Sequence, residues 1–214
     1  SEQYQNASGW PSLPINALNQ LGSTGGSNTQ VDYINLATTG NATDFGDTLA
    51  AAGYRAAAAS TTRALFAGGY DGSSVLNQIE FTTIASTGSF TDFGDILAVQ
   101  YGLRGLSNST RGVFGGGDGS GTASNVIQYV TIASAGNATD FGDMTTGKYL
   151  AASCASPTRG IFSGGTTTFT QSTAQNIIEY ITISSTGNGT DFGDLTLYRW
   201  NFGGCSSSVR GVFG

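Results

Sequence analysis

The chain has 214 residues, a net charge of −6 at pH 7, 10% charged residues, 33 glycines, three prolines and no histidine. This composition excludes a charged disordered chain and a proline-rich linker, and the small number of basic residues argues against binding to a nucleic-acid backbone. Without histidine there is no Ser-His-Asp or Cys-His catalytic arrangement. Two cysteines alone do not make a zinc site.

Residues 1–29 come first and differ from everything that follows. Trp10, Leu13 and Leu18 make this segment too apolar for a free tail, and Pro11 and Pro14 interrupt it. We expect an arm that docks on the following domain or attaches the protein to another subunit, which includes a second copy of this chain. The segment lacks the basic start and apolar stretch of a secretion signal, and no apolar run in the chain reaches the roughly 18 residues that cross a bilayer. We therefore expect synthesis in the cytoplasm and no membrane insertion.

Residues 30–214 carry an internal repeat. The tetrapeptide Asp-Phe-Gly-Asp begins at residues 44, 92, 140 and 191, so the period is 48 to 51 residues. An Arg-x-x-Phe motif keeps the same register. A repeat of this length is typical of solenoids, propellers and arrays. The repeated acidic residues are Asp44, Asp47, Asp92, Asp95, Asp140, Asp143, Asp191 and Asp194, and the repeated arginines are Arg63, Arg111, Arg159 and Arg210.

One repeat contains four strand-like segments. In the third copy, residues 150–156 are mostly small, and residues 159–165 form a short apolar run that ends in glycines. Residues 176–184 alternate apolar and polar side chains, as a half-buried strand does, and a turn then leads to a short outer strand at residues 190–195. Four short strands per period predict an all-β fold of four-stranded antiparallel blades, which is a β-propeller.

The two ends of the repeat region predict how the propeller closes. The region begins with a third-type strand and ends with a second-type strand, so residues 30–50 and 201–214 can share one blade. Residues 51–98, 99–146 and 147–200 supply three continuous blades, which makes a four-bladed ring without an open sheet edge. The alternative is a piece of a larger propeller of about five to seven blades, or a ring completed by another subunit.

The repeat resembles the kelch repeat of β-propellers. It shares the paired glycines after the second strand and an aromatic residue in the third strand, at Tyr33, Phe81, Tyr129 and Tyr180. It departs from the kelch pattern before the outer strand, where Phe45, Phe93, Phe141 and Phe192 replace a tryptophan. The sequence of the whole repeat also resembles that of repeat proteins encoded by marine tailed phages, cyanophages among them. The first resemblance implies a kelch-like β-propeller over residues 30–214, and the second implies a virion protein.

The repeated charges have two conceivable roles. Two carboxylates three residues apart could act as acid and base or bind calcium. A group that every blade carries is more simply explained as part of the blade, because a catalytic site needs one copy of each group. We therefore predict that one aspartate of each pair caps the turn before the outer strand and that the other forms an ion pair with a repeat arginine. Glu80 and Glu179, at equivalent third-strand positions, are assigned to the architecture as well.

Candidate binding residues are those at which the copies differ. An aromatic residue stands at or next to the start of each inner strand, and Gln100, Lys148 and Arg199 directly precede three of these rings. Near the mouth of a propeller channel such side chains suit a glycan or a peptide; the alternative is that the rings wedge between blades. Loops on a rigid scaffold are further binding sites. The candidate ligand-binding residues are Tyr54, Tyr101, Lys148, Tyr149, Arg199 and Trp200 at the mouth and Tyr70 and Phe169 in the loops.

Cys154 and Cys205 occupy the same position in the last two copies. They can form a disulfide if their Cα atoms lie within about 7 Å. Otherwise they are free thiols that pack as small apolar residues, which is the state we favour for a chain without a secretion signal.

These observations favour a non-enzymatic, virion-associated module of a tailed phage, in a tail fibre, a baseplate or a capsid decoration. We expect it to bind other virion proteins, or a host surface glycan or protein, through the propeller loops, and we expect no cofactor, metal or nucleic acid. A cellular, cytoplasmic kelch-like adaptor that binds another protein is the alternative. A carbohydrate-active enzyme that uses two carboxylates is less favoured.

Overall fold

The structure is a computed structural model that describes residues 16–20, 29–168 and 171–214. Phe169 and most of the predicted arm at residues 1–29 lie outside these ranges. The described chain is all-β, as predicted, with antiparallel pairing between its strands and a single 3-10 turn, η1 (Gln171–Thr173). Within it, no helix is long and apolar enough to cross a membrane.

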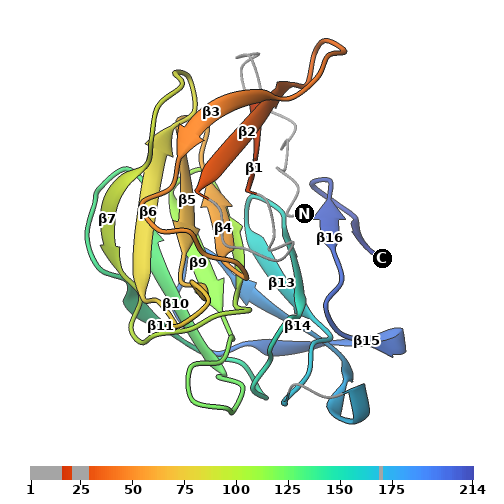
Figure 1. Ribbon diagram of the computed structural model, residues 1–214. Helices are drawn as coiled ribbons and strands as arrows, with labels where there is room; N and C mark the ends of the chain where they lie inside the picture. Colours follow the sequence, from red (N-terminus) through yellow and green to blue (C-terminus); the bar gives the residue numbers. More distant parts are fainter. Residues whose placement is uncertain (1–15, 21–28, 169–170) are drawn as a thin grey trace.

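Three four-stranded sheets form the centre of the molecule, and each comes from one repeat (Figure 1). Within each sheet, neighbouring strands are consecutive in the chain. Sheet A contains β4 (Ala56–Ala59), β5 (Arg63–Ala67), β6 (Gln78–Thr83) and β7 (Thr91–Asp95). Sheet B contains β8 (Arg104–Ser107), β9 (Arg111–Gly115), β10 (Val126–Thr131) and β11 (Thr139–Asp143). Sheet C contains β12 (Ala152–Ala155), β13 (Arg159–Ser163), β14 (Gln175–Thr182) and β15 (Thr190–Arg199).

Two shorter sheets flank this centre. The N sheet contains β1 (Asn16–Gln20), β2 (Gln30–Asn35) and β3 (Thr43–Asp47), and the C hairpin contains β16 (Gly204–Ser206) and β17 (Gly211–Phe213). The predicted pairing of β17 with β2 is not formed among the described residues. Instead, β2 pairs with β1 on one edge and with β3 on the other, while β17 pairs with β16. A strand from the predicted arm therefore occupies the edge that closure requires, and the closed four-bladed ring stays a prediction.

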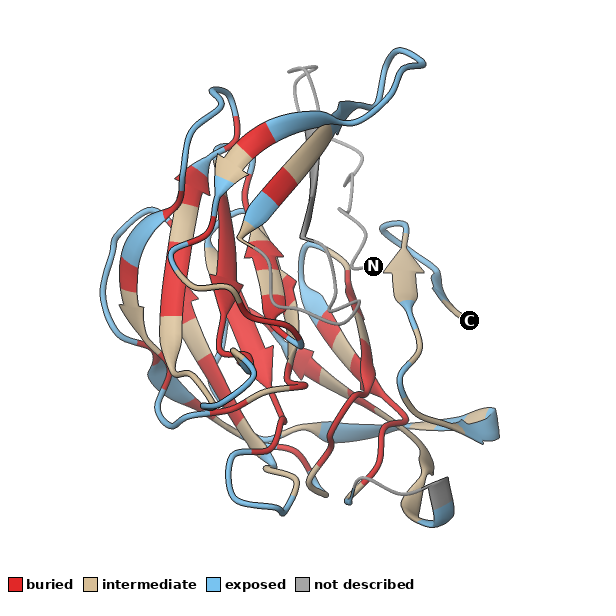
Figure 2. Cartoon of the chain, viewed as in Figure 1, coloured by how far each residue is buried: buried red, intermediate tan, exposed pale blue. Residues whose placement is uncertain are grey.

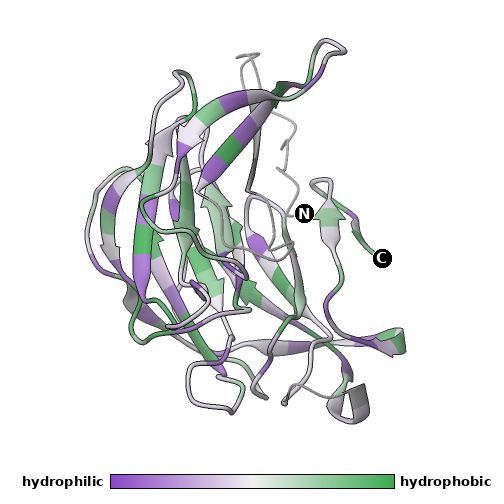
Figure 3. Cartoon of the chain, in the orientation of Figure 1, coloured by the Kyte–Doolittle hydropathy of each residue, from purple (hydrophilic) through white to green (hydrophobic). Residues whose placement is uncertain are grey.

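The hydrophobic core lies between successive sheets. Leu65, Ile79 and Phe93 of sheet A belong to one buried cluster with Phe114 and Val130 of sheet B. Equivalent clusters join the N sheet to sheet A and sheet B to sheet C. Figure 2 shows buried residues concentrated in the central strands, and Figure 3 shows that many of the same strand positions are apolar. Sheets A and B each pack against a neighbouring sheet on both faces, which explains why their strands carry apolar runs.

The outer strands β3, β7 and β11 each contact a turn of the next sheet through glycine. The N–H of Gly136 donates to the carbonyl of Phe93 at 2.7 Å, and the N–H of Asp95 donates to Asn137 Oδ1 at 3.0 Å. Gly94 has φ +144°, and a Cβ there would lie 2.6 Å from the Gly136 carbonyl carbon. Only glycine allows the two backbones to approach so closely. The same contact joins Gly46 to Gly88 and Gly142 to Gly187.

Among the described residues the repeat arginines form no ion pair with the repeat aspartates, so that prediction is wrong. The guanidinium carbons of Arg63, Arg111 and Arg159 lie 4.3 to 4.6 Å from the ring centres of the third-strand aromatic residues. Arg63 and Arg111 also donate to the carbonyls of Ile132 and Ile183 in the next sheet, at 3.0 and 2.9 Å. Stacking on an aromatic face and bonding to a carbonyl satisfy arginine without a carboxylate.

The aspartates have mainly local roles. Asp44 Oδ1 accepts the N–H of Gly46 at 3.0 Å, and Asp191 Oδ1 accepts that of Gly193 at 3.2 Å. These bonds lie within the outer strand, so they differ from the predicted cap of the turn before it. Cys154 and Cys205 are free thiols, and burial raises the pKa of Cys154 to about 11.

Gly94→Ala will destabilise the fold more than Gly193→Ala. Both positions have positive φ, +144° and +133°, but a Cβ at Gly193 meets no atom within 4 Å. Both variants bear backbone strain of about 1–3 kcal/mol, and Gly94→Ala adds an overlap that costs about 1–3 kcal/mol more. Urea unfolding of dilute protein measures the difference. Equal losses would show that the backbone contact does not constrain position 94.

Arg111→Ala will destabilise the fold more than Arg159→Ala. Both arginines stack on a ring, but only Arg111, which is half-buried, also donates to a carbonyl of a following sheet. A hydrogen bond from a charged group contributes about 1.5–3 kcal/mol, which is the expected difference in unfolding free energy. If both variants lose the same unfolding free energy, the hydrogen bond of Arg111 contributes nothing and the stacking on the ring is the interaction that matters at this repeat position.

Candidate functional site

The candidate site is built on the loops that lead from one sheet into the inner strand of the next. One residue in each of these incoming loops has a left-handed backbone: Tyr54, Gly102, Leu150 and Asn201, with φ between 51° and 66°. These residues form a chain of backbone hydrogen bonds, Gly102 to Tyr54 at 2.8 Å, Leu150 to Gly102 at 2.9 Å and Asn201 to Leu150 at 2.8 Å. We call this chain the loop arc. Left-handed backbone is unfavourable for residues other than glycine and is often kept at functional sites.

Four tyrosines gather on the loop arc. The ring centre of Tyr101 lies 6.1 Å from that of Tyr54, 6.0 Å from that of Tyr70 and 5.2 Å from that of Tyr149. Tyr54 and Tyr70 are exposed, Tyr101 is half-buried and Tyr149 is buried. We call these four residues the tyrosine cluster. It brings together four of the residues proposed from the sequence to bind a ligand.

Both sequence-based interpretations of these rings apply, each to a different tyrosine. Tyr149 wedges between sheets, because its ring fills the space that a Cβ at Gly102 would need. Burial, followed by the influence of Tyr101, raises the pKa of Tyr149 above its ordinary value. Tyr54 and Tyr70 remain open to a ligand. Buried Asp118 lies in the strand-like bridge opposite Tyr101, and its carboxylate accepts the N–H groups of Ser120 and Gly121 at 2.9 and 2.7 Å.

A buried polar residue in the third strand of each sheet anchors the incoming loop. Glu80, Gln128 and Glu179 accept the N–H groups of Leu49, Leu97 and Thr145 at 2.5, 2.7 and 2.6 Å. The other end of each acceptor group meets a second polar side chain of the same loop. These partners are Arg55 for Glu80, Gln100 for Gln128 and Lys148 for Glu179.

The structure corrects the role predicted for Lys148. Its side chain is buried, and Nζ lies 3.1 Å from Glu179 Oε2 and 3.1 Å from Gln175 Oε1. Burial lowers the pKa of Lys148, and the attraction of Glu179 opposes this shift. Lys148 is therefore an internal anchor and does not face a ligand. Arg199 is half-buried and donates to the Phe213 carbonyl at 3.3 Å, next to Trp200, which is also half-buried.

Arg55 was missed in the sequence, although a signal for it exists. Gln100 and Lys148 precede their aromatic residues, but Ala52 stands at the equivalent position of the first copy. Ala52 cannot form a polar contact with Glu80. Arg55, three residues later, is the partner of Glu80 instead. In the next copy, the position equivalent to Arg55 holds Leu103. A charged residue at an apolar repeat position, in the copy that lacks the usual polar one, identifies the substitute.

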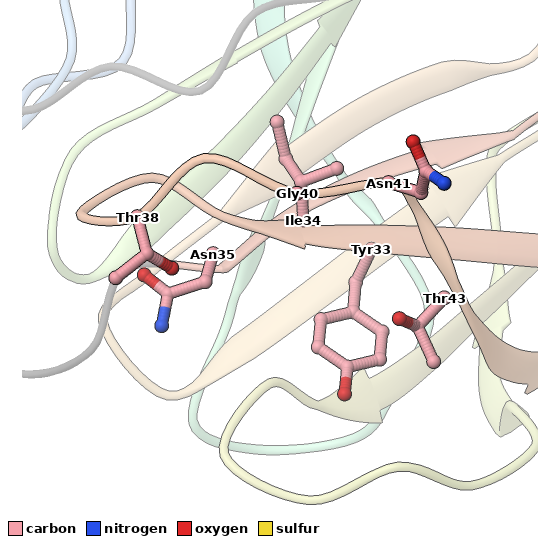
Figure 4. A pocket seen from close by; sticks show the side chains of 7 residues that line it. All are labelled: Tyr33, Ile34, Asn35, Thr38, Gly40, Asn41 and Thr43. Atoms are coloured by element: carbon pink, nitrogen blue, oxygen red, sulfur yellow. The ribbon is translucent and has the colours of Figure 1, made fainter.

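A separate pocket of about 390 Å³ lies at the β2–β3 turn, lined in part by Ile34, Asn35, Gly40 and Asn41 (Figure 4). None of its lining residues belongs to the tyrosine cluster. The described residues contain no group of three or more side chains suited to hold a metal ion.

Comparison with protein-family models and with curated proteins gave no match for this chain. The resemblance to kelch repeats and to phage repeat proteins therefore remains a prediction from the sequence.

Replacing both members of the Lys148–Glu179 pair by glutamine will be far less harmful than replacing one. Each single variant leaves a buried charge without its partner, which costs about 3–5 kcal/mol. The double variant reproduces the Gln100–Gln128 pair of sheet B, which keeps the acceptor for the loop N–H. Thermal and urea unfolding of the three variants measure this coupling. A double variant as unstable as the sum of the singles would contradict it.

Proposed function

We propose that this protein is a non-enzymatic binding module whose tyrosine cluster contacts a glycan. The observation that carries the proposal is the meeting of Tyr54, Tyr70 and Tyr101 on the strained loop arc, with two of the rings exposed. Tyrosine combines an apolar ring with a hydroxyl, which suits the mixed apolar and polar faces of a sugar. The rigid loops hold these rings in place, so little side-chain entropy is lost on binding.

The proposed scaffold is a kelch-like β-propeller of four blades, and the proposed location is the virion of a tailed phage. The recurring four-stranded sheets support the propeller-like part of this proposal. The ring would close when β17 pairs with β2 in place of β1. The proposed location rests only on the resemblance of the repeat sequence to phage repeat proteins. Mass spectrometry of purified phage particles tests it directly. In this setting the tyrosine cluster would bind a host surface glycan, and other surfaces would bind virion proteins.

A glycan array with the purified chain tests the binding function. We expect binding to a defined set of glycans, and we expect Tyr54→Ala and Tyr70→Ala each to weaken it about tenfold or more, because anchoring aromatic residues dominate such contacts. Tyr198→Ala is the matched control, since Tyr198 is an exposed tyrosine of β15 outside the cluster.

Two results would count against the glycan proposal. One is the absence of binding to every glycan on the array. The other is an equal loss of binding in the Tyr198 control, which would place the contact elsewhere. Capture of a virion protein that depends on Tyr54 and Tyr70 would instead assign the cluster to a protein partner.

A further inference from the structure

An acidic side chain that the proposed function does not use lies beside the tyrosine cluster. Asp118 and Tyr101 form an antiparallel bridge in which the N–H of each residue donates to the carbonyl of the other at 2.9 Å. Side chains of residues paired in this way lie on the same face of the sheet, so the carboxylate of Asp118 lies beside the ring of Tyr101. Burial, followed by the influence of Tyr101, Tyr54 and Asp118, raises the pKa of Tyr149. The carboxylate is therefore close enough to the cluster to affect a second hydroxyl in it.

One oxygen of this carboxylate has no partner in the described chain. Asp118 Oδ1 accepts the N–H groups of Ser120 and Gly121, whereas no described residue donates a hydrogen bond to Oδ2 or forms an ion pair with Asp118. Tyr70 and Thr166 stand at the same position of the neighbouring copies, so the repeat does not require an acidic residue here. A carboxylate whose charge the chain does not compensate favours a cationic ligand.

The rings of the cluster are arranged to contact a cation. The ring planes of Tyr54 and Tyr70 lie at 74° and 44° to that of Tyr101, so the rings do not form one flat platform. A corner of ring faces suits a compact cation, because each face attracts positive charge within about 6 Å of the ring centre. The chain already uses this interaction where Arg111 lies 4.5 Å from the ring centre of Tyr129. No cation of the described chain stacks in this way on Tyr54, Tyr70 or Tyr101.

The site belongs to the interior of the stack of sheets. Tyr70 follows β5, Asp118 follows β9, and Tyr101 stands in the loop that enters β8. Sheets A and B, which carry these loops, each pack against a neighbouring sheet on both faces. The sheets that adjoin these loops are therefore in place on both sides, and the site does not depend on how the ring closes.

We propose that the tyrosine cluster and Asp118 bind a sugar that carries a protonated amino group. This inference rests on the proposed glycan-binding function and names the class of glycan. The ammonium group would lie against the rings of Tyr70 and Tyr101 and donate a hydrogen bond to Asp118 Oδ2, while the apolar face of the sugar would pack on Tyr54. An N-acetylated sugar lacks the charge and loses the first two contacts. A lysine side chain carries the same ammonium group but has no ring face for Tyr54 to contact.

Calorimetric titration of the full chain compares a glucosamine hexasaccharide with the N-acetylglucosamine hexasaccharide, at physiological salt and at a slightly acidic pH that protonates the amino groups. We expect the amino form to bind about tenfold more tightly or better. Asp118→Asn will abolish this preference, because the amide keeps an oxygen for the N–H groups of Ser120 and Gly121 but carries no charge. Asp118→Thr, which introduces the residue of the third copy, will abolish it as well.

Asp44→Asn is the matched control. Asp44 is an exposed aspartate of β3 that also accepts a neighbouring backbone N–H, from Gly46, and it lies outside the cluster. This variant removes the same charge from the protein and will keep the preference of the wild type. Far-UV circular dichroism and urea unfolding will show that the Asp118 variants and the control keep the wild-type fold.

The outcomes separate this inference from the proposed function. A protein that binds both hexasaccharides equally, or only glycans without amino groups, would overturn the inference and leave the proposed function standing. A preference lost equally in Asp44→Asn would overturn it too, because net charge alone would then explain the preference. Tighter binding of a lysine peptide than of the amino hexasaccharide would assign the site to a protein partner. A protein that binds no glycan at all would overturn both proposals.

Discussion

A buried polar side chain in the third strand of each sheet holds the loop that carries the candidate site. The incoming loop turns a backbone N–H toward the interior, where an unpaired donor costs free energy. Glu80, Gln128 and Glu179 accept this N–H in sheets A, B and C. Once the loop is anchored, its left-handed residue can bond to that of the preceding loop, and the loop arc forms. The positions of the tyrosines follow from the arc.

The three sheets satisfy the anchor in chemically different ways. Glu80 takes an arginine, Glu179 takes a lysine, and Gln128 takes another glutamine. The neutral pair shows that the geometry does not need charge. It needs an acceptor for the loop N–H and, inside the protein, a polar partner for the remaining group: a cation for each glutamate and the Gln100 carbonyl oxygen for the Gln128 amide. At this repeat position the third-strand residue and its loop partner differ together from sheet to sheet, and each pair anchors the loop. This agrees with the architectural role assigned from the sequence to Glu80 and Glu179.

The strands and their order were predictable because they depend on local patterns. Alternation in residues 176–184 and the repeated Asp-Phe-Gly-Asp tetrapeptide mark strands that the structure contains as β14 and β15. The partners of charged residues were not predictable in the same way. The repeat places arginine and aspartate in fixed register, but the third-strand ring lies nearer to the arginine across the sheet, so stacking replaces the expected ion pair.

Burial was the second property that the sequence concealed. Lys148 stands in a loop beside an aromatic residue, which is typical of a surface position, and only its contact with Glu179 from β14 shows that it is internal. The predicted pairing that would close the ring is also not formed among the described residues. The repeat pattern shows which strand types are missing at each end, but β1 lies outside the repeat, so the pattern could not predict that β1 pairs with the edge of β2.

A residue that recurs in every copy was assigned to architecture, and the ends of the array show where that assignment stops. Phe93 and Phe192 have the same neighbours along the chain, yet one is core and the other is surface. Phe93 is core because residues of sheet B pack on it. In a stack of repeats each unit contacts only its neighbours, so a residue at a given repeat position is buried only where a neighbouring unit packs on it. The role of a recurring residue therefore depends on its neighbours in space as well as on its place in the repeat.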